Sequence, residues 1–229
     1  MTWPDADAGP ILAVPVGSCE QHGPHLPLGT DTFIAVALCE RLAARRPDVV
    51  VAPAVAISAS GEHAGFPGTL SLGTEATATL LVELARSADW AAEIMLVNGH
   101  GGNQAAVTRA VATLRGEGRH VRAWWPSIPD GDAHAGRTET SLMLAIRPDL
   151  VRTERCAAGN IRPLAAIAEQ LRAHGVQALS PNGVLGDPSA ATLDEGIRLL
   201  DMLADDLVAS VSQAIPFPDQ HTTRRLPAS

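Results

Sequence analysis

Two clusters of polar residues carry the side chains with the clearest chemistry in this sequence. The first cluster, at residues 20–31, contains two carboxylates and two imidazoles: Glu20, His22, His25 and Asp31. The second, at residues 98–103, places His100 among three glycines. Imidazole and carboxylate groups together suit borderline divalent ions such as Zn, Mn or Fe. The two clusters therefore indicate a metal-dependent hydrolase.

Each of these residues also has an ordinary structural explanation. Glu20 and His22 are two positions apart, so an extended chain points both to one side, but a polar loop with a structural histidine has the same spacing. Asp31 precedes a helix-like run and can be a metal ligand or a helix N-cap. The glycines around His100 permit a sharp turn. A phosphate-binding turn would need a lysine or a fuller glycine pattern, so a metal or oxyanion role is favoured.

Two further segments contain side chains that can take part in the same site. Glu139 opens a helix-like run, where it either suits the helix dipole or acts as a second metal ligand. His134, five residues earlier, is a structural histidine or a proton donor to a leaving amine. Glu62 and His63 lie in a glycine-rich loop that forms an ordinary turn or lines a pocket.

The composition restricts the class of protein. The 229 residues fit one domain, 1–229, with an irregular tail at 216–229, and 46% hydrophobic residues predict a folded chain. A net charge of −8 without a basic patch argues against nucleic-acid binding. Three widely spaced cysteines predict no disulfide framework and a cytoplasmic location. The polar, acidic first residues do not resemble a secretory signal, and no apolar run reaches the roughly 18 residues of a membrane span.

Strand-like and helix-like segments alternate along the chain. Short apolar runs predict strands at 11–16, 49–53, 94–97 and 121–125, although Pro15 cannot donate a hydrogen bond within a sheet. Helices are expected at 32–46, 75–88, 103–117, 139–145, 163–174 and 192–215. This alternation predicts a three-layer α/β/α sandwich around a mostly parallel sheet. Both polar clusters follow a strand, so we expect them to meet at the carboxyl edge of that sheet.

The set of motifs resembles the creatininase family of metal-dependent amidohydrolases over nearly the whole chain. The matching segments are residues 14–18, 20–27, Asp31, 60–63, 66–71, 98–103, 134–141 and 183–188. The resemblance implies the creatininase-like α/β fold, amide hydrolysis, and two divalent metal ions per subunit, Zn, Fe or Mn. It also implies a homohexamer.

The resemblance implies roles for individual residues. Glu20, His22, Asp31 and His100 match the family's metal ligands, with Asp31 as the bridge, His134 matches its catalytic histidine, and Glu62 and His63 are expected at the substrate. One position departs from the pattern. Creatinine-cleaving members carry a glutamate two positions after the ligand histidine, where this chain has Gly102. The departure disfavours creatinine as substrate and leaves the second metal short of a ligand, which Glu139 is expected to supply.

Within the family, the chain most resembles peptidases that process a precursor of a peptide-derived redox cofactor. That similarity implies release of a C-terminal Val-Tyr dipeptide from a precursor peptide modified by a radical SAM enzyme. Two alternatives are a hydrolase of a small cyclic amide or formamide, and a non-catalytic metal-binding scaffold in a biosynthetic complex. The gene neighbourhood and turnover with metal fully loaded would separate these hypotheses.

Overall fold

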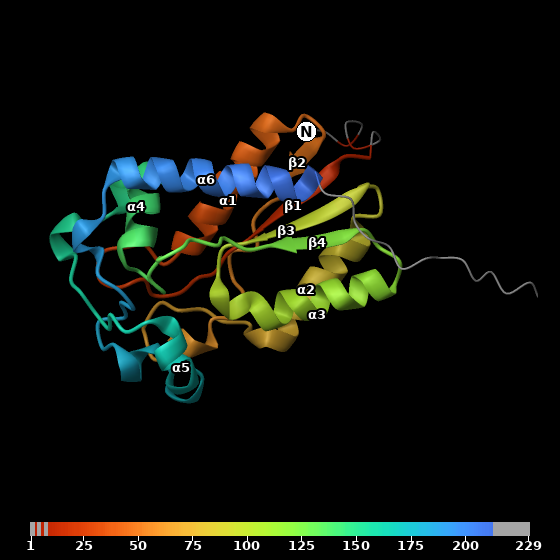
Figure 1. Ribbon diagram of the computed structural model, residues 1–229. Helices are drawn as coiled ribbons and strands as arrows, with labels where there is room; N and C mark the ends of the chain where they lie inside the picture. Colours follow the sequence, from red (N-terminus) through yellow and green to blue (C-terminus); the bar gives the residue numbers. More distant parts are fainter. Residues whose placement is uncertain (1–2, 4–5, 7–8, 213–229) are drawn as a thin grey trace, which may run out of the picture.

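A parallel sheet forms the centre of the molecule in the computed structural model, which describes residues 3, 6 and 9–212. In this part of the chain the strands are β1 (Ile11–Val16), β2 (Val49–Val51), β3 (Glu93–Asn98) and β4 (Val121–Trp124). They pair in the order β2-β1-β3-β4, and every pair is parallel (Figure 1). The tail at 216–229 and the last three residues of the helix expected at 192–215 lie outside the described residues.

Helices cover both faces of the sheet. The helices are α1 (Thr30–Arg45), α2 (Gly73–Ser87), α3 (Gln104–Gly116), α4 (Arg137–Ile146), α5 (Leu164–Leu179) and α6 (Leu193–Ser212). Short 3₁₀ turns lie between them: η2 (Gly61–His63), η3 (Gly101–Asn103), η4 (Pro148–Leu150), η5 (Thr153–Arg155) and η6 (Pro188–Ala190). In Figure 1, α1, α4 and α6 lie on one side of the sheet and α2 and α3 on the other. The predicted three-layer α/β/α sandwich is confirmed.

The apolar runs in the sequence are strands buried on both faces. On β3, Met95 and Val97 pack into the core beneath α1, α4 and α6, while Ile94 and Leu96 pack into the core beneath α2 and α3. Because side chains alternate across a strand, a strand with helices on both sides must be apolar at nearly every position. This explains why the strands read as continuous apolar runs.

Three local features bear on the sequence expectations. Pro15 is accommodated in β1 because its carbonyl pairs with the backbone N–H of Val55 (2.9 Å), so its nitrogen faces the side where β2 has already ended. Gly175, with φ 72° and ψ 176°, interrupts α5, so the helix expected at 163–174 stops where it was expected and a second helical segment follows to Leu179. Asp31 does not precede α1 but lies in its first turn, and no side chain caps that helix.

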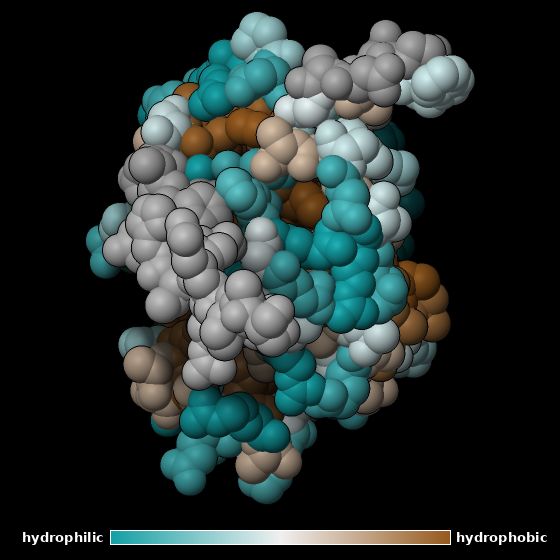
Figure 2. Space-filling model, turned by 90° about the vertical axis from the view of Figure 1, so that its right-hand side faces the viewer, coloured by the Kyte–Doolittle hydropathy of each residue, from teal (hydrophilic) through white to brown (hydrophobic). Residues whose placement is uncertain are grey.

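The topology creates a crevice between β1 and β3. The chain leaves β1 through α1 towards β2, and leaves β3 through α3 towards β4 on the opposite side. Where the connections from two neighbouring parallel strands run to opposite sides, the sheet has a topological switch point. Ligands bind there, beyond the carboxyl ends of the two strands. Both polar clusters of the sequence begin there, since they follow β1 and β3. Figure 2 shows the other end of the molecule, where hydrophilic residues cover much of the visible surface.

Among the described residues, no helix combines the length and the apolar character that a membrane crossing requires.

Candidate metal centre

The Asp31 carboxylate joins the two clusters. Its Oδ1 lies 3.1 Å from His22 Nε2, and its Oδ2 lies 3.2 Å from His100 Nδ1. The Ser18 hydroxyl donates a hydrogen bond of 2.7 Å to Oδ2 and so fixes the orientation of the carboxylate. The expected convergence of His22, Asp31 and His100 is confirmed. Because Asp31 is in the first turn of α1, the helix itself aims the carboxylate at the end of the sheet.

Glu20 is a fully buried carboxylate whose oxygens accept no hydrogen bond. Its Oε1 lies 3.2 Å from His63 Nε2 and its Oε2 3.1 Å from His100 Nε2, yet neither oxygen accepts a hydrogen bond. Burial raises the pKa of Glu20 to about 8. A buried carboxylate left in this way costs free energy unless a cation compensates it. The orphaned oxygens therefore fit a site for a divalent metal ion.

The possible ligand atoms form two groups that share Asp31. Glu20, Asp31 and His100 make one group, and His22, Asp31 and Glu139 make the other, with the ligand atoms of each group within 4.8 Å of one another. Glu20 and His22 also form a third such group with His134. A carboxylate common to two ligand sets is the arrangement that a bridged two-metal site requires.

Glu139 lies beside the His22 side of this arrangement. Its Oε2 is 3.7 Å from His22 Nε2 and accepts a hydrogen bond of 2.6 Å from the backbone N–H of Ala135. Its exposed fraction of 19% compares with 2% for Asp31. The Glu139 carboxylate does not point to solvent and lies in the centre, on the side of His22.

The carboxylates favour positive charge on His22 and His100. Although burial lowers the pKa of His22, the carboxylate of Asp31 more than offsets it and raises this pKa to about 10. The pKa of His100 likewise rises to about 9, because Glu20 and Asp31 outweigh the effect of burial. Carboxylates that stabilise protonated histidines in this way also favour the binding of a metal cation.

Two asparagines, which sequence reasoning did not assign, hold the loops of the centre together. Asn103 donates to Gly17 O and to Asn98 Oδ1, both at 3.0 Å, and accepts from the Ala59 N–H at 3.0 Å. Asn98 in turn donates to the carbonyl of His100 at 2.6 Å. The loops after β1, β2 and β3 are thus tied to one buried amide. Their signal in the sequence is the pair of asparagines that flanks the glycines around His100.

His134 reaches the centre from the turn before α4. Its backbone pairs with Leu185 in both directions, and its Nε2 lies 2.8 Å from the carbonyl oxygen of Gln21. A carbonyl can only accept, so Nε2 carries the ring proton and Nδ1 faces Glu20 Oε1 at 3.8 Å. Burial, followed by His22 and His63, holds the pKa of His134 well below its usual range. The ring is therefore neutral near pH 7.

Gln21 was also missed from the sequence, although it stands between Glu20 and His22. Its Oε1 accepts from the Gly23 N–H at 2.9 Å, which fixes the direction of the amide. Its Nε2 then donates to the Gly183 carbonyl and to His63 Nδ1, both at 2.9 Å. His63 consequently carries its proton on Nε2, which faces Glu20. The Nε2–H group of His63 is thus directed at Glu20 Oε1, 3.2 Å away, without forming a hydrogen bond to it.

Comparison with known proteins assigns the chain to a family. The family model described as "Creatininase: Creatinine amidohydrolase" matches residues 1–211. The chain belongs to the creatininase family. It is 50% identical over 221 residues to the mycofactocin precursor peptide peptidase of Mycobacterium tuberculosis, covering 92% of this chain and 88% of that protein. It is 55% identical over 197 residues to the protein of the same name from Mycolicibacterium smegmatis, covering 83% and 79%.

Solved creatininase structures share the fold. A creatinine amidohydrolase structure superposes with a TM-score of 0.77 at 26% identity over 96% of both chains. Others are described as a manganese creatininase and as a Zn-Zn form of a creatininase variant. The family makes this protein a hydrolase, and metal binding is a property named for its structural relatives.

Position 102 has no room for a side chain in this structure. A Cβ atom at position 102 would overlap Glu62 Oε1 and His100 Nε2 and would lie 2.7 Å from the carbonyl of Ala59. The Glu62 carboxylate therefore occupies the space that a side chain at position 102 would need. Glu62 Oε1 lies 3.5 Å from His100 Nε2.

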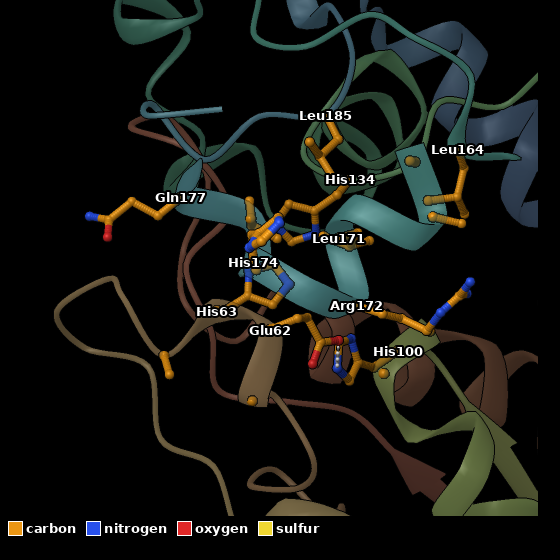
Figure 3. Close-up of a pocket in the computed structure, with 18 of the residues that line it drawn as sticks. Glu62, His63, His100, His134, Leu164, Leu171, Arg172, His174, Gln177 and Leu185 are labelled. Atoms are coloured by element: carbon orange, nitrogen blue, oxygen red, sulfur yellow. Dashed lines mark ion pairs between the residues drawn. The ribbon is translucent and has the colours of Figure 1, made fainter. Parts of the chain in front are cut away.

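A cavity of about 1210 Å³ opens next to this candidate centre. Asp31, His100, His134 and Glu139 line it on the side of the sheet, together with Glu62 and His63. The α5 helix contributes an apolar stripe on the other side, formed by Leu164, Ala168 and Leu171 (Figure 3). Arg172 is the only lysine or arginine among the described residues that line this cavity. A smaller cavity of about 290 Å³ adjoins His100 and Glu139 near Trp125.

Proposed function

We propose that this protein is a metal-dependent peptidase that hydrolyses an amide bond of the mycofactocin precursor peptide. It releases a C-terminal Val-Tyr dipeptide from the precursor after a radical SAM enzyme has modified it. Relatives at 50% and 55% identity carry the name of this peptidase. The observation that carries the proposal is the pair of ligand groups that share Asp31 at the wall of a cavity of about 1210 Å³. A cavity of this volume has room for the end of a peptide.

The residues present fit two divalent ions, Zn, Fe or Mn. Glu20, Asp31 and His100 would hold one ion, and His22, Asp31 and Glu139 the other. When bound, such ions supply Lewis-acid activation of a water molecule and of the substrate carbonyl. The orphaned oxygens of Glu20 support this assignment, because neither accepts a hydrogen bond from the described residues.

His134 is the residue we assign to proton transfer. The contact with the Gln21 carbonyl fixes its tautomer, and the free Nδ1 faces the centre. A neutral imidazole in this position accepts the proton lost by the attacking water and delivers it to the departing amine. Glu62 and His63 line the cavity as substrate-facing residues, and Arg172 offers a guanidinium to a carboxylate of the peptide.

The proposal extends to the whole protein. We place residues 1–229 in one creatininase-like domain, in a cytoplasmic homohexamer whose partner is the modified precursor peptide. Nucleic acid is not part of its function, since the net charge is −8.

A direct assay tests this function. The protein is loaded with Zn, Fe or Mn and incubated with the radical-SAM-modified precursor, and mass spectrometry follows the products. We expect a fragment that contains the last two residues and a precursor shortened by two residues. Creatinine and a formylated amine are assayed in parallel. Turnover of either of these without peptide cleavage would support the small-amide alternative. A fully loaded protein that turns over none of the three would support the scaffold alternative.

A further inference from the structure

The oxygens around one nitrogen of His100 outnumber the protons available to them. His100 Nε2 has Ala59 O at 2.9 Å, Glu20 Oε2 at 3.1 Å and Glu62 Oε1 at 3.5 Å. The backbone carbonyl takes the single proton on this nitrogen, because it forms the hydrogen bond. Two carboxylate oxygens then remain within 3.5 Å of this nitrogen without a proton from it. Such a pair attracts a cation.

Glu62 is held in this position by backbone packing. It lies on η2, and α5 closes over that turn at Gly175. A Cβ atom at Gly175 would be 2.8 Å from the Glu62 carbonyl oxygen, and the φ of 72° also requires glycine. On the other side, Gly102 leaves open the space into which the Glu62 carboxylate extends. Figure 3 shows Glu62 directed at His100, with the ion pair between them marked.

We infer that Glu62 is a further carboxylate of the metal centre, in the space that the absence of a side chain at Gly102 leaves open. Glu139 supplies the group beside His22, whereas Glu62 supplies negative charge beside Glu20 and His100. The glycine at 102 and the glutamate at 62 are complementary, because their side chains would compete for the same volume. This role goes beyond lining the cavity for substrate, and it rests on the proposed metal centre but not on the identity of the peptide.

Metal affinity, measured apart from turnover, tests the inference. Calorimetric titration of the metal-free protein with Zn²⁺ or Mn²⁺ is compared for the wild type, Glu62→Gln and Glu62→Asp. Glu62→Gln keeps the shape but removes the charge, and we expect one of the two ions to bind about 10- to 100-fold more weakly. Glu62→Asp keeps the charge and should recover part of the affinity. Glu154→Gln is the matched control, because Glu154 is 66% exposed and outside the centre.

A spectroscopic measurement distinguishes the loss of a metal ligand from a loss of the fold. Co²⁺ is substituted for the native ion, and its visible absorption reports the oxygen and nitrogen atoms around it. Glu62→Gln should change this spectrum while the circular dichroism of the protein stays the same. Wild-type affinity for both ions together with an unchanged Co²⁺ spectrum would overturn the role of Glu62 and leave the proposed function intact. A wild-type protein that binds no divalent ion would overturn the proposed function and this inference together.

Discussion

At the scale of single residues, one backbone carbonyl decides the chemistry open to His134. Gln21 O accepts the proton on Nε2 and so turns the basic Nδ1 towards Glu20. A histidine that contributes to proton transfer without being essential for metal loading should affect turnover most. The residues grouped around Asp31, in contrast, should affect metal loading.

Replacing His134 with alanine should therefore lower kcat about 100- to 10,000-fold while both metal ions are retained. The loss arises because the amine must leave as an unprotonated, poor leaving group. Steady-state kinetics and elemental analysis of the same preparation measure the two effects. His120→Ala, which alters a histidine just before β4, is the control. Near wild-type kcat in His134→Ala would transfer the role to another group, with His63 the nearest candidate.

Glu139 provides a second prediction at this scale. Glu139→Gln should weaken one metal ion much more than the other, because the carboxylate faces His22 and Asp31 but is absent from the Glu20 group. Stepwise titration with metal, followed by elemental analysis, resolves the two ions. Glu169→Gln, an exposed change on α5, should bind both ions normally. If both ions bind more weakly to the same extent, Glu139 contributes only its negative charge to the centre and is not a ligand of one ion.

At the scale of elements, the loops at the carboxyl ends of the strands depend on a few buried polar side chains. Asn103 connects the loops that follow β1, β2 and β3 through its single amide. The chain needs this connection because short, glycine-rich loops have little apolar surface of their own to bury. Asn103 thus ties Gly17, Ala59 and Asn98 to one another by hydrogen bonds.

Replacing Asn103 with alanine should destabilise the protein by about 2–4 kcal/mol, since three buried partners lose their hydrogen bonds. Urea denaturation at fixed metal concentration measures the change in the free energy of unfolding. Thr108→Ala, at an exposed position of α3, should change it by less than about 0.5 kcal/mol. If Asn103→Ala proves as stable as that control, the amide does not hold the loops together.

At the scale of the whole molecule, metal binding should be coupled to folding. The ligand groups come from the chain after β1, from α1, from the loop after β3 and from α4, so they assemble only in the folded protein. A ligand that binds the native state alone stabilises it by mass action. The centre therefore ties together segments from across the sandwich.

Removal of metal by a chelator should accordingly lower Tm, by about 2–4 °C for each kcal/mol of binding free energy lost at this chain length. Differential scanning calorimetry with and without chelator measures the shift, and added Zn²⁺ or Mn²⁺ should reverse it. In His100→Ala the chelator should shift Tm less, because one ligand is already missing. Identical Tm values with metal and with chelator would contradict a bound metal in the native wild type.

The sequence by itself determined the layers and the principal residues of the centre. Apolar runs alternating with helical segments specify a buried parallel sheet, because a strand covered on both faces must be apolar throughout. The positions of Glu20 after β1 and of His100 after β3 then place them at one edge. These inferences need only local periodicity and the rules for connecting parallel strands.

Only the tertiary structure decided which neighbours those residues have. Asn103 and Gln21 act through partners more than 40 positions away, such as Ala59 and His63, and no local pattern specifies such pairs. The exchange between Glu62 and Gly102 is a matter of volume, which becomes visible only when two loops are packed together. The bend of α5 at Gly175 likewise depends on a contact with Glu62. Local sequence sets conformation and burial, whereas close packing of distant segments sets the geometry of the site.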